Sequence, residues 1–309
     1  MIQSKLALDA ATAVRPFMKW AGGKGQLLPE LSRRLPRRFR RYHEPFVGGG
    51  ALFFHLVNSG RLRHGALLSD FNPELILCYQ VVRDDVEALI EALRRHEQHR
   101  LDGEYFREVR SWDRRADFEQ RSPVERAART IFLNRTCYNG LYRLNQKGQF
   151  NAPFGHYRNP LICDPVNMRA VSRALRHVDL AVGDFGDVLG RVEPGDLVYF
   201  DPPYVPMSAT ASFTHYTGQT FGSEAQRRLA DLFAELARRG VHVMLSNSHT
   251  PLSNELYTPH AVHKEVVYAS RKINCDGLKR GLVEELIVCS YAPDTSTLLD
   301  DGLDHVAQP

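Results

Sequence analysis

An apolar tetrapeptide that runs into a proline pair limits the fold of this chain more than any other stretch. Leu197–Phe200 has the composition of a buried parallel strand, and Asp201 is followed at once by Pro202 and Pro203. Because proline lacks a backbone N–H group, the chain must leave the sheet at Asp201. Open α/β sheets bind ligands beyond the carboxyl ends of their strands. We therefore expect this carboxylate, a rigid turn and the ring of Tyr204 at a ligand-binding edge.

The groups in this turn suit a planar amine that must be made to attack a methyl donor. The Asp201 carboxylate and the Pro202 carbonyl can each accept one amine hydrogen, and the Tyr204 ring can stack on a base. Two such acceptors would draw the nitrogen toward tetrahedral geometry and free its lone pair. The alternative is an Asx-type proline turn with a surface tyrosine, and the rest of the chain has to distinguish the two.

An earlier pair of βα units predicts a Rossmann-like sheet. His43–Val47 is typical of a short strand, Gly48–Gly50 of a tight turn and Ala51–Val57 of a helix, and a second strand over Ala66–Ser69 ends at Asp70. Asp70 lies 22 residues after Gly48, the distance at which an acid grips a ribose diol. The glycines do not fit G-x-G-x-x-G, so we expect a mononucleoside without a pyrophosphate. S-adenosylmethionine fits that description.

Further strand ends and helix starts extend this pattern. Asn72-Pro73 predicts a helix cap, and a helix is expected from Gln26. Asp184, after a strand-like run, is expected to accept from the adenine amine of the cofactor while Phe185 covers the ring; the alternative is a turn acid beside a core phenylalanine. The remaining expectations are a helix over Ser223–Arg239, a strand over His242–Ser246 and an antiparallel pair formed by Val266–Ala269 and Glu285–Cys289.

The alternation of strands and helices is interrupted between residues 83 and 157. This region is mostly helical in pattern, with one helix near Val124–Asn134, and ends in Thr136–Tyr157, where Lys147-Gly148 predicts a hairpin turn. A β-ribbon fits the DNA major groove, where arginine pairs with guanine, so a nucleic-acid reader is favoured over a plain hairpin. The loop Val205–Tyr216 is a candidate for closing over a bound base.

Charge and cysteine content point to a partner and a compartment. Residues 1–41 carry a net charge of +8 and the rest of the chain −4, which favours a polyanion partner over a merely solvated face. No apolar run has membrane-spanning length, and Met1–Val14 does not resemble a signal peptide. The five cysteines include no Cys-x-x-Cys pair and are expected to be reduced thiols. No histidines have metal-ligand spacing, so we expect no metal.

Five sequence blocks in this order resemble the Dam-type DNA adenine-N6 methyltransferases, which form the D12 class, group α. The blocks are Lys19–Lys24, Glu44–Ala51, Asn139–Asn145, Phe150–Gly155 and Asp201–Tyr204. The resemblance covers about residues 17–291. It implies a Rossmann-like methyltransferase domain, S-adenosylmethionine as the donor, and direct transfer to adenine N6 with no covalent enzyme intermediate.

The resemblance also implies roles for individual residues. The catalytic group is Asp201, Pro202, Pro203 and Tyr204. The cofactor-binding candidates are Trp20, Ala21, Gly22, Lys24, Glu44, Pro45, Phe46, Gly48, Gly50, Asp70, Asn72, Asp184, Phe185 and Asp201. The DNA-binding candidates are Lys19, Tyr138, Asn139, Leu141, Arg143, Asn145, Pro153 and Tyr157.

Within the DNA-binding group the implied roles differ. Lys19 matches a lysine that reaches the first guanine of a GATC-like site, and Tyr138 a ring that enters the stack beside the extruded adenine. Leu141 and Pro153 match groups on the thymine side, and Arg143 the arginine that reads the final base pair through guanine.

These observations predict an α/β fold in which a Rossmann-like methyltransferase sheet carries an inserted, mostly helical target-recognition domain with a β-hairpin. The expected domains are residues 12–82 with 160–292, an insert at 83–159, and a disordered tail at 293–309. The predicted function is methylation of adenine N6 in duplex DNA, within GATC, by a cytoplasmic, nucleoid-associated monomer. A cognate restriction endonuclease is left open. So are action on cytosine N4 or RNA adenine, and a non-catalytic DNA-binding relative.

Overall fold

A computed structural model of the 309-residue chain describes residues 13–20, 22–204, 221–270 and 282–293. Three of the sequence predictions therefore lie outside the described residues. They concern Ala21, the loop Val205–Tyr216 and the tail after Pro293.

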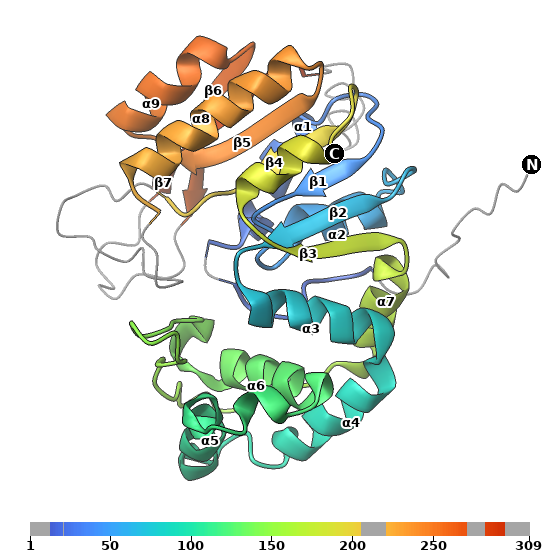
Figure 1. Cartoon of the computed structure of the whole chain (residues 1–309), viewed down its shortest axis with the longest axis vertical. Coiled ribbons are helices and arrows are strands. Elements are labelled where there is room, and N and C mark those ends of the chain that lie inside the picture. Colours follow the sequence, from blue (N-terminus) through green and yellow to red (C-terminus); the bar gives the residue numbers. More distant parts are fainter. Residues whose placement is uncertain (1–12, 21, 205–220, 271–281, 294–309) are drawn as a thin grey trace, which may run out of the picture.

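A single seven-stranded sheet, in the order β3-β2-β1-β4-β5-β7-β6, organises the described chain (Figure 1). The strands are β1 Tyr42–Glu44, β2 Ala66–Asp70, β3 Val178–Val182, β4 Leu197–Phe200, β5 His242–Ser248, β6 His263–Ser270 and β7 Leu282–Cys289. The first five in spatial order are parallel, and β7 is antiparallel to both of its neighbours. The mixed α/β fold and the antiparallel terminal pair confirm the sequence prediction.

The strand order reverses between β1 and β4. From β1 the chain moves outward through β2 to β3, then returns to place β4 on the other side of β1 and continues to β5. Tyr42 of β1 pairs with Ala66 on one side and Leu197 on the other. In a parallel sheet this switch point opens a crevice at the carboxyl ends of the two strands. The turns after β1 and β4 are therefore brought side by side.

Alternating side chains of the central strands enter two separate apolar cores. Leu197 and Tyr199 belong to the core that includes α1 Leu28–Arg33, α2 Ala51–Asn58, α3 Pro73–Asp84 and α7 Pro165–Leu175. Val198 and Phe200 belong to the other core, against α8 Ser223–Arg238 and α9 Pro251–Tyr257. Both faces of β4 are buried because successive strand residues point to opposite faces. That explains its continuous apolar composition.

The inserted region packs on the helix that follows β2. Its helices are α4 Val86–Glu97, α5 Gly103–Arg110 and α6 Pro123–Thr136, and α6 packs directly on α3, which lies between it and the sheet (Figure 1). Short 3₁₀ turns occur at Lys24–Gln26, Ser111–Arg114, Phe118–Gln120, Tyr138–Gly140, Phe185–Gly190 and Thr258–His260. The apolar core continues from the sheet into the insert. The predicted division into a methyltransferase domain and an inserted target-recognition domain therefore stays a prediction.

Two local predictions differ from the structure. The helix expected from Gln26 begins at Leu28, after a 3₁₀ turn, because Pro29 suits the first turn of a helix. The predicted hairpin turn is present, with Gly148 at φ 74°, but its backbone pairing amounts to the isolated bridges Leu144–Phe150 and Cys137–Phe154 and forms no regular strands.

Side chains of the insert bind the outward-facing backbone groups of the second arm. The carbonyls of Phe150 and Ala152 accept from Arg114 (2.8 Å) and Arg110 (3.2 Å), and the Phe150 N–H donates to Asp113 (2.7 Å). Between the arms, the Asn145 N–H donates to the Gln149 carbonyl (2.8 Å) and the Asn151 N–H to the Arg143 carbonyl (2.9 Å). The second arm is therefore bonded to the first arm on one edge and to the helices of the insert on the other.

Within the described ranges, no helix has the length and apolar character needed to cross a membrane. The cysteines at 78, 137, 163 and 289 are buried and unpaired.

Candidate active site

The Asp201 carboxylate, at the end of β4, has two chemically different oxygens. Oδ1 accepts from Lys24 Nζ (2.7 Å) and from Ser246 Oγ (3.3 Å). In the part of the chain that the structure describes, no donor is bonded to Oδ2. Burial raises the pKa of Asp201 to about 6, against the opposing effect of the Lys24 ammonium. At neutral pH the site therefore presents an ionised carboxylate with one oxygen held and one oxygen open.

Lys24 connects Asp201 to Tyr204. Its ammonium is 5% exposed and donates to Asp201, to the Gly22 carbonyl (3.2 Å) and to the Tyr204 hydroxyl, and it lies 4.3 Å from the centroid of the Tyr204 ring. The hydroxyl donates in turn to Glu285 Oε2 (2.5 Å) on β7. Burial and the neighbouring Asp201 raise the pKa of Tyr204, so the hydroxyl stays protonated. The ring next to Asp201 is thus held at its polar end.

Sequence reasoning missed two polar residues that complete this cluster. Ser246 follows the apolar run Val243–Leu245 of β5, and Glu285 is the buried member of the acid pair Glu284-Glu285 in β7. A polar residue inside a buried strand is the signal that could have identified both. Their connection to Asp201 and Tyr204 depends on the pairing of β5 with β4 and β7, which the chain order does not reveal.

The glycine turn after β1 is packed against Trp20. Gly48 has φ 48°, and a Cβ there would lie 2.6 Å from Trp20 Cδ1, so the indole rests directly on the backbone. Gly50, at φ 66°, precedes α2, and a Cβ there would lie 2.8 Å from the Tyr79 hydroxyl. Both positions require glycine for conformation and for space. Tyr142 of the insert also stacks on Trp20, with ring centroids 5.4 Å apart.

Asp70, at the end of β2, holds the glycine turn in place. Its Oδ2 accepts from the Gly48 N–H (3.2 Å) and its Oδ1 from the Asn72 N–H (3.0 Å). Burial raises its pKa to about 6 despite these bonds. Asn72 caps α3 by accepting from Glu74 (3.1 Å) and Leu75 (3.3 Å), as predicted. Because each carboxylate oxygen can accept twice, Asp70 keeps capacity for a hydroxyl group.

Glu44, Pro45 and Phe46, which precede the glycine turn, are packed against other protein groups. Glu44 is buried and accepts from the Tyr42 hydroxyl (2.9 Å). Burial raises its pKa to about 8, so it is mostly protonated at neutral pH. Pro45 is also buried, and Phe46 stacks on Phe185 with centroids 5.5 Å apart. These side chains support the site from within the core.

Asp184 and Phe185 are already engaged by protein groups. Asp184 caps the following 3₁₀ turn through the Gly186 N–H (2.9 Å) and pairs with Arg228 (2.7 Å). Phe185 is 6% exposed, between Phe46 and the Arg228 guanidinium. The exposed ring at this edge is Phe71, which is 50% exposed and follows Asp70 directly. Sequence reasoning missed Phe71, although an aromatic residue after a strand-end acid was a usable signal.

Three asparagine side chains clamp the extended segment that leads to Trp20. Each amide accepts from the N–H and donates to the carbonyl of one residue: Asn58 at Val14, Asn167 at Arg15 and Asn134 at Lys19. Asn134 is fully buried at the end of α6 and also donates to the Gly140 carbonyl (3.1 Å). One side chain therefore joins the Lys19 backbone to the turn that carries Tyr138 and Asn139.

The DNA-binding candidates gather around that turn and the segment after it. Tyr138 is 49% exposed and its N–H donates to the Pro153 carbonyl (2.8 Å), while Asn139 is exposed with φ 55°. The Lys19 ammonium lies 4.3 Å from the centroid of the Tyr157 ring. Leu141 is half-buried and Pro153 exposed.

Two polar candidates in this segment have partners within it. Arg143 is exposed, and its guanidinium donates to the side-chain oxygen (2.7 Å) and the carbonyl (3.1 Å) of Asn151. Asn145 accepts from the N–H groups of Lys147 (2.9 Å) and Gln149 (3.0 Å), so its side chain forms the turn.

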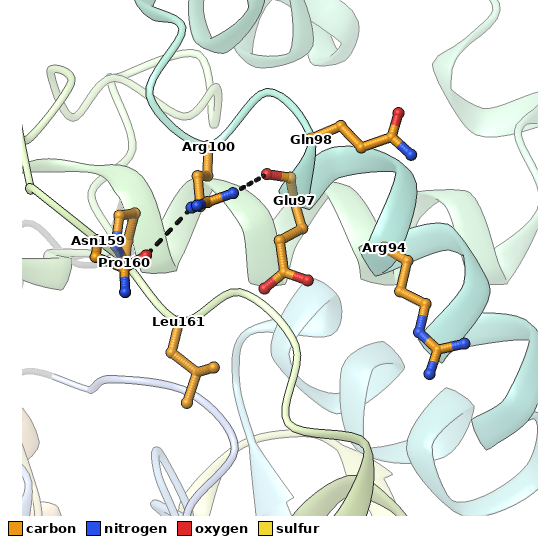
Figure 2. Close-up of a pocket in the computed structure, with 7 residues that line it drawn as sticks. All are labelled: Arg94, Glu97, Gln98, Arg100, Asn159, Pro160 and Leu161. Carbon is orange, nitrogen blue, oxygen red and sulfur yellow. Dashed lines mark hydrogen bonds between the residues drawn. The ribbon is translucent and has the colours of Figure 1, made fainter.

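A cavity of about 600 Å³ lies elsewhere, on the insert (Figure 2). It is lined by Arg94, Glu97, Gln98, Arg100, Asn159, Pro160 and Leu161. Arg100 is held there by the Glu97 carbonyl (3.2 Å) and Asn159 (3.3 Å). No candidate catalytic, cofactor-binding or DNA-binding residue lines this cavity. The candidate active site is therefore the edge of the sheet around Asp201, not the cavity.

The switch-point crevice and its acids define an α/β protein with a ligand-binding edge between β1 and β4. The family model for D12 class N6 adenine-specific DNA methyltransferase matches residues 20–270. The chain belongs to this family and is an adenine-specific DNA methyltransferase.

Three curated relatives are similar to this chain over nearly their whole length. A type II methyltransferase of Lactococcus lactis subsp. cremoris, M1.LlaDCHI, is 44% identical, covering 90% of this chain and 96% of the relative. M.MjaIII, a type II methyltransferase of Methanocaldococcus jannaschii, is 44% identical, covering 90% and 99%. The DNA adenine methylase of Escherichia coli K12 is 35% identical, covering 90% and 96%.

Proposed function

We propose that the protein transfers the methyl group of S-adenosylmethionine to N6 of an adenine in GATC, after the base rotates out of the DNA duplex. The observation that carries this proposal is the pair of acceptors at the end of β4. Asp201 has its Oδ1 held by Lys24 and Ser246 and its Oδ2 open. The neighbouring Pro202 carbonyl accepts no hydrogen bond from the described residues.

The residues at the edge of the sheet fit the nucleoside part of this cofactor. Asp70 has acceptor capacity for a ribose hydroxyl, and the exposed ring of Phe71 offers an apolar face beside it. Gly48 and Gly50 bring backbone close to the crevice without side chains, and Trp20 lies against that backbone. When bound, the cofactor supplies an electrophilic methyl group.

The protein's own contribution is to orient the target amine. Asp201 Oδ2 and the Pro202 carbonyl accept its two hydrogens, which draws the nitrogen toward tetrahedral geometry and withdraws its lone pair from delocalisation into the ring. Tyr204 supports the base by stacking, and its ring is held by Lys24 and Glu285. Nitrogen gains the methyl group as the bond between that methyl group and sulfur breaks, and it loses one proton, which Asp201 Oδ2 is placed to receive. No covalent enzyme intermediate is needed.

Recognition of the site is assigned to the insert and to Lys19. The half-exposed Tyr138 enters the stack where the adenine leaves it, with Asn139 beside it. Arg143 reads a guanine, because a guanidinium pairs bidentately with its O6 and N7 atoms. Leu141 and Pro153 supply apolar contacts for thymine, and Lys19 reaches the first guanine.

The remaining partner assignments are also proposals. Two of the similar proteins are named type II methyltransferases. On that basis we propose a search for a cognate restriction endonuclease of this chain. We propose a monomeric enzyme acting at the nucleoid, where its duplex substrate is.

The proposal is tested by methyl transfer from labelled S-adenosylmethionine to duplexes containing GATC, GATT or no GAT, followed by digestion to nucleosides. Label in N6-methyladenine from the GATC duplex alone is expected. Equal label from GATC and GATT would remove Arg143 from the reading role. Label in another nucleoside, or none, would contradict the proposed reaction.

Asp201→Ala separates chemistry from binding. This variant loses the acceptor for the amine and should show no transfer, while its calorimetrically measured affinity for the cofactor stays close to that of the wild type. Turnover like the wild type's would contradict the mechanism.

A further inference from the structure

A buried glutamine lies directly behind the catalytic turn. Gln226, in the first turn of α8, is 1% exposed, and its Nε2 donates to the Pro203 carbonyl (3.2 Å). Its Oε1 accepts from Asn247 Nδ2 (3.1 Å) on β5 and from the Tyr257 hydroxyl (3.0 Å) on α9. The Gln226 side chain thus connects the turn after β4 to α8, β5 and α9.

The turn needs such a partner because of its two prolines. Pro202 and Pro203 have no backbone N–H, so neither can donate a hydrogen bond to the neighbouring strands. The remaining way to hold this peptide is through a carbonyl, which requires an external donor. Gln226 supplies that donor one residue after the Pro202 carbonyl and one residue before Tyr204.

The Ser248 backbone N–H determines which atom donates and which accepts in the hydrogen bonds between Asn247, Gln226 and Pro203. The Ser248 N–H can only donate, and it donates to Asn247 Oδ1 (2.8 Å). The amide nitrogen of Asn247 therefore faces Gln226 and donates to Oε1. The amide nitrogen of Gln226 is then left to face Pro203. The orientation of the Gln226 amide is set by the sheet rather than by the turn that it holds.

We propose that Gln226 is a positioning residue for methyl transfer, which aims the Pro202 carbonyl and the Tyr204 ring by holding the Pro203 carbonyl between them. This inference rests on the proposed role of the turn as the site of the target amine. Because the reaction depends on the alignment of the amine with its acceptors, a small rotation of this peptide lowers the rate without removing any group that touches the substrates.

The test compares two substitutions at this position with a control in the same helix. Gln226→Met keeps the length of the side chain but has no donor. We expect its single-turnover rate on GATC duplex to fall on the order of tenfold to a hundredfold, with cofactor affinity within about threefold of the wild type's. Leu229→Ala, a fully buried α8 residue that does not contact the turn, should lower the melting temperature but leave the rate unchanged.

Gln226→Glu gives a readout that a purely structural role would not move. A protonated carboxyl can still donate to the Pro203 carbonyl, whereas an ionised one repels it. The rate of this variant divided by that of the wild type should therefore fall as pH rises from 6 to about 9, which cancels any titration shared by both enzymes.

Each outcome decides the inference. A wild-type rate in Gln226→Met, or a ratio for Gln226→Glu that does not vary with pH, would overturn it. If Gln226→Met does not fold, the pH dependence of Gln226→Glu decides alone. Failure of the proposed function is recognised separately, because the wild-type enzyme itself would then form no N6-methyladenine on any duplex.

Discussion

At the scale of single residues, the site depends on carboxylates whose ionisation burial makes difficult. Asp201 and Asp70 each have a pKa raised to about 6, and Glu44 one raised to about 8. The pKa values of Asp201 and Asp70 lie below that of Glu44 because Asp201 accepts from the Lys24 ammonium and Asp70 accepts from two backbone N–H groups. Glu44 faces a neutral hydroxyl. Only Asp201 combines an ionised form at neutral pH with an open oxygen beside an aromatic ring.

The pH dependence of the reaction should reflect Asp201. Its carboxylate must be ionised to accept an amine hydrogen, so kcat/KM should be level above about pH 7 and fall about tenfold per unit well below pH 6. The measurement is kcat/KM for GATC duplex between pH 5 and 8. A profile that stays level to pH 5 would contradict this assignment.

Lys24→Met supplies the comparison for that profile. The Lys24 ammonium lowers the pKa of Asp201, so removing it should move the acidic limb to higher pH. Any change in cofactor affinity would alter the height of the profile but not the position of this limb. An unmoved limb would show that another group titrates.

At the scale of elements, the recognition segment is fixed by the helices of the insert. Arg110, Asp113 and Arg114 bond to the backbone of its second arm, and the Asn145 side chain closes its turn. Arg143 projects from the first arm with two of its donors on Asn151. The guanidinium is therefore held in one orientation by its own segment, and in the proposed reading role this reduces the entropy cost of contacting a base.

Arg143→Ala should reduce discrimination at one base pair by about 1 to 3 kcal/mol. The reason is the loss of a bidentate contact to guanine, whereas phosphate contacts elsewhere are kept. The measurement is kcat/KM on GATC and on the three duplexes altered at the final position. Lys147→Ala, which removes an exposed cation from the same turn, is the matched control and should leave the preference intact. An unchanged preference in Arg143→Ala would exclude it as the reader.

At the scale of the whole molecule, the sheet and the insert are joined by packing and by one amide. The apolar core runs without interruption from α3 into α6, and Trp20 contacts both Gly48 of the sheet and Tyr142 of the insert. Asn134 adds a polar connection between the Lys19 backbone and Gly140. The glycine turn after β1 and the turn that carries Tyr138 are thus joined through packed side chains and hydrogen bonds.

Asn134→Ala should therefore affect stability and DNA binding together. It removes three hydrogen bonds, to the Lys19 N–H, the Lys19 carbonyl and the buried Gly140 carbonyl, for which we expect a loss on the order of 3 kcal/mol in the free energy of unfolding. We also expect DNA affinity to fall about tenfold, because the Tyr138 turn loses its attachment to Lys19. Denaturant unfolding and a binding titration on GATC duplex measure the two effects.

Asn167→Ala is the control for this prediction. Asn167 is 4% exposed and clamps Arg15 in the same way, but it contacts no part of the recognition turn. Its removal should destabilise the protein while leaving DNA affinity unchanged. Equal losses of affinity in both variants would show that the effect is one of general stability.

The sequence by itself determined the local elements and the type of chemistry. Short runs of apolar residues predicted β4, β2 and the terminal antiparallel pair, because a strand that is buried on both faces is apolar throughout. Asn72-Pro73 predicted the start of α3, because cap and first-turn residues act locally. The sequence Asp201-Pro202-Pro203 predicted a polar site at a strand end. Proline has no backbone N–H in any fold, so the strand must end there.

Only the tertiary structure decided which groups meet. Ser246, Gln226 and Glu285 reach the turn after β4 from β5, α8 and β7, and no spacing along the chain relates them to Asp201 or its neighbours. Side chains of the insert helices bind the outward-facing backbone groups of the hairpin's second arm. Burial also set the protonation of Glu44 and Asp70. These features depend on long-range packing and desolvation, which arise only when strands far apart in the sequence become neighbours.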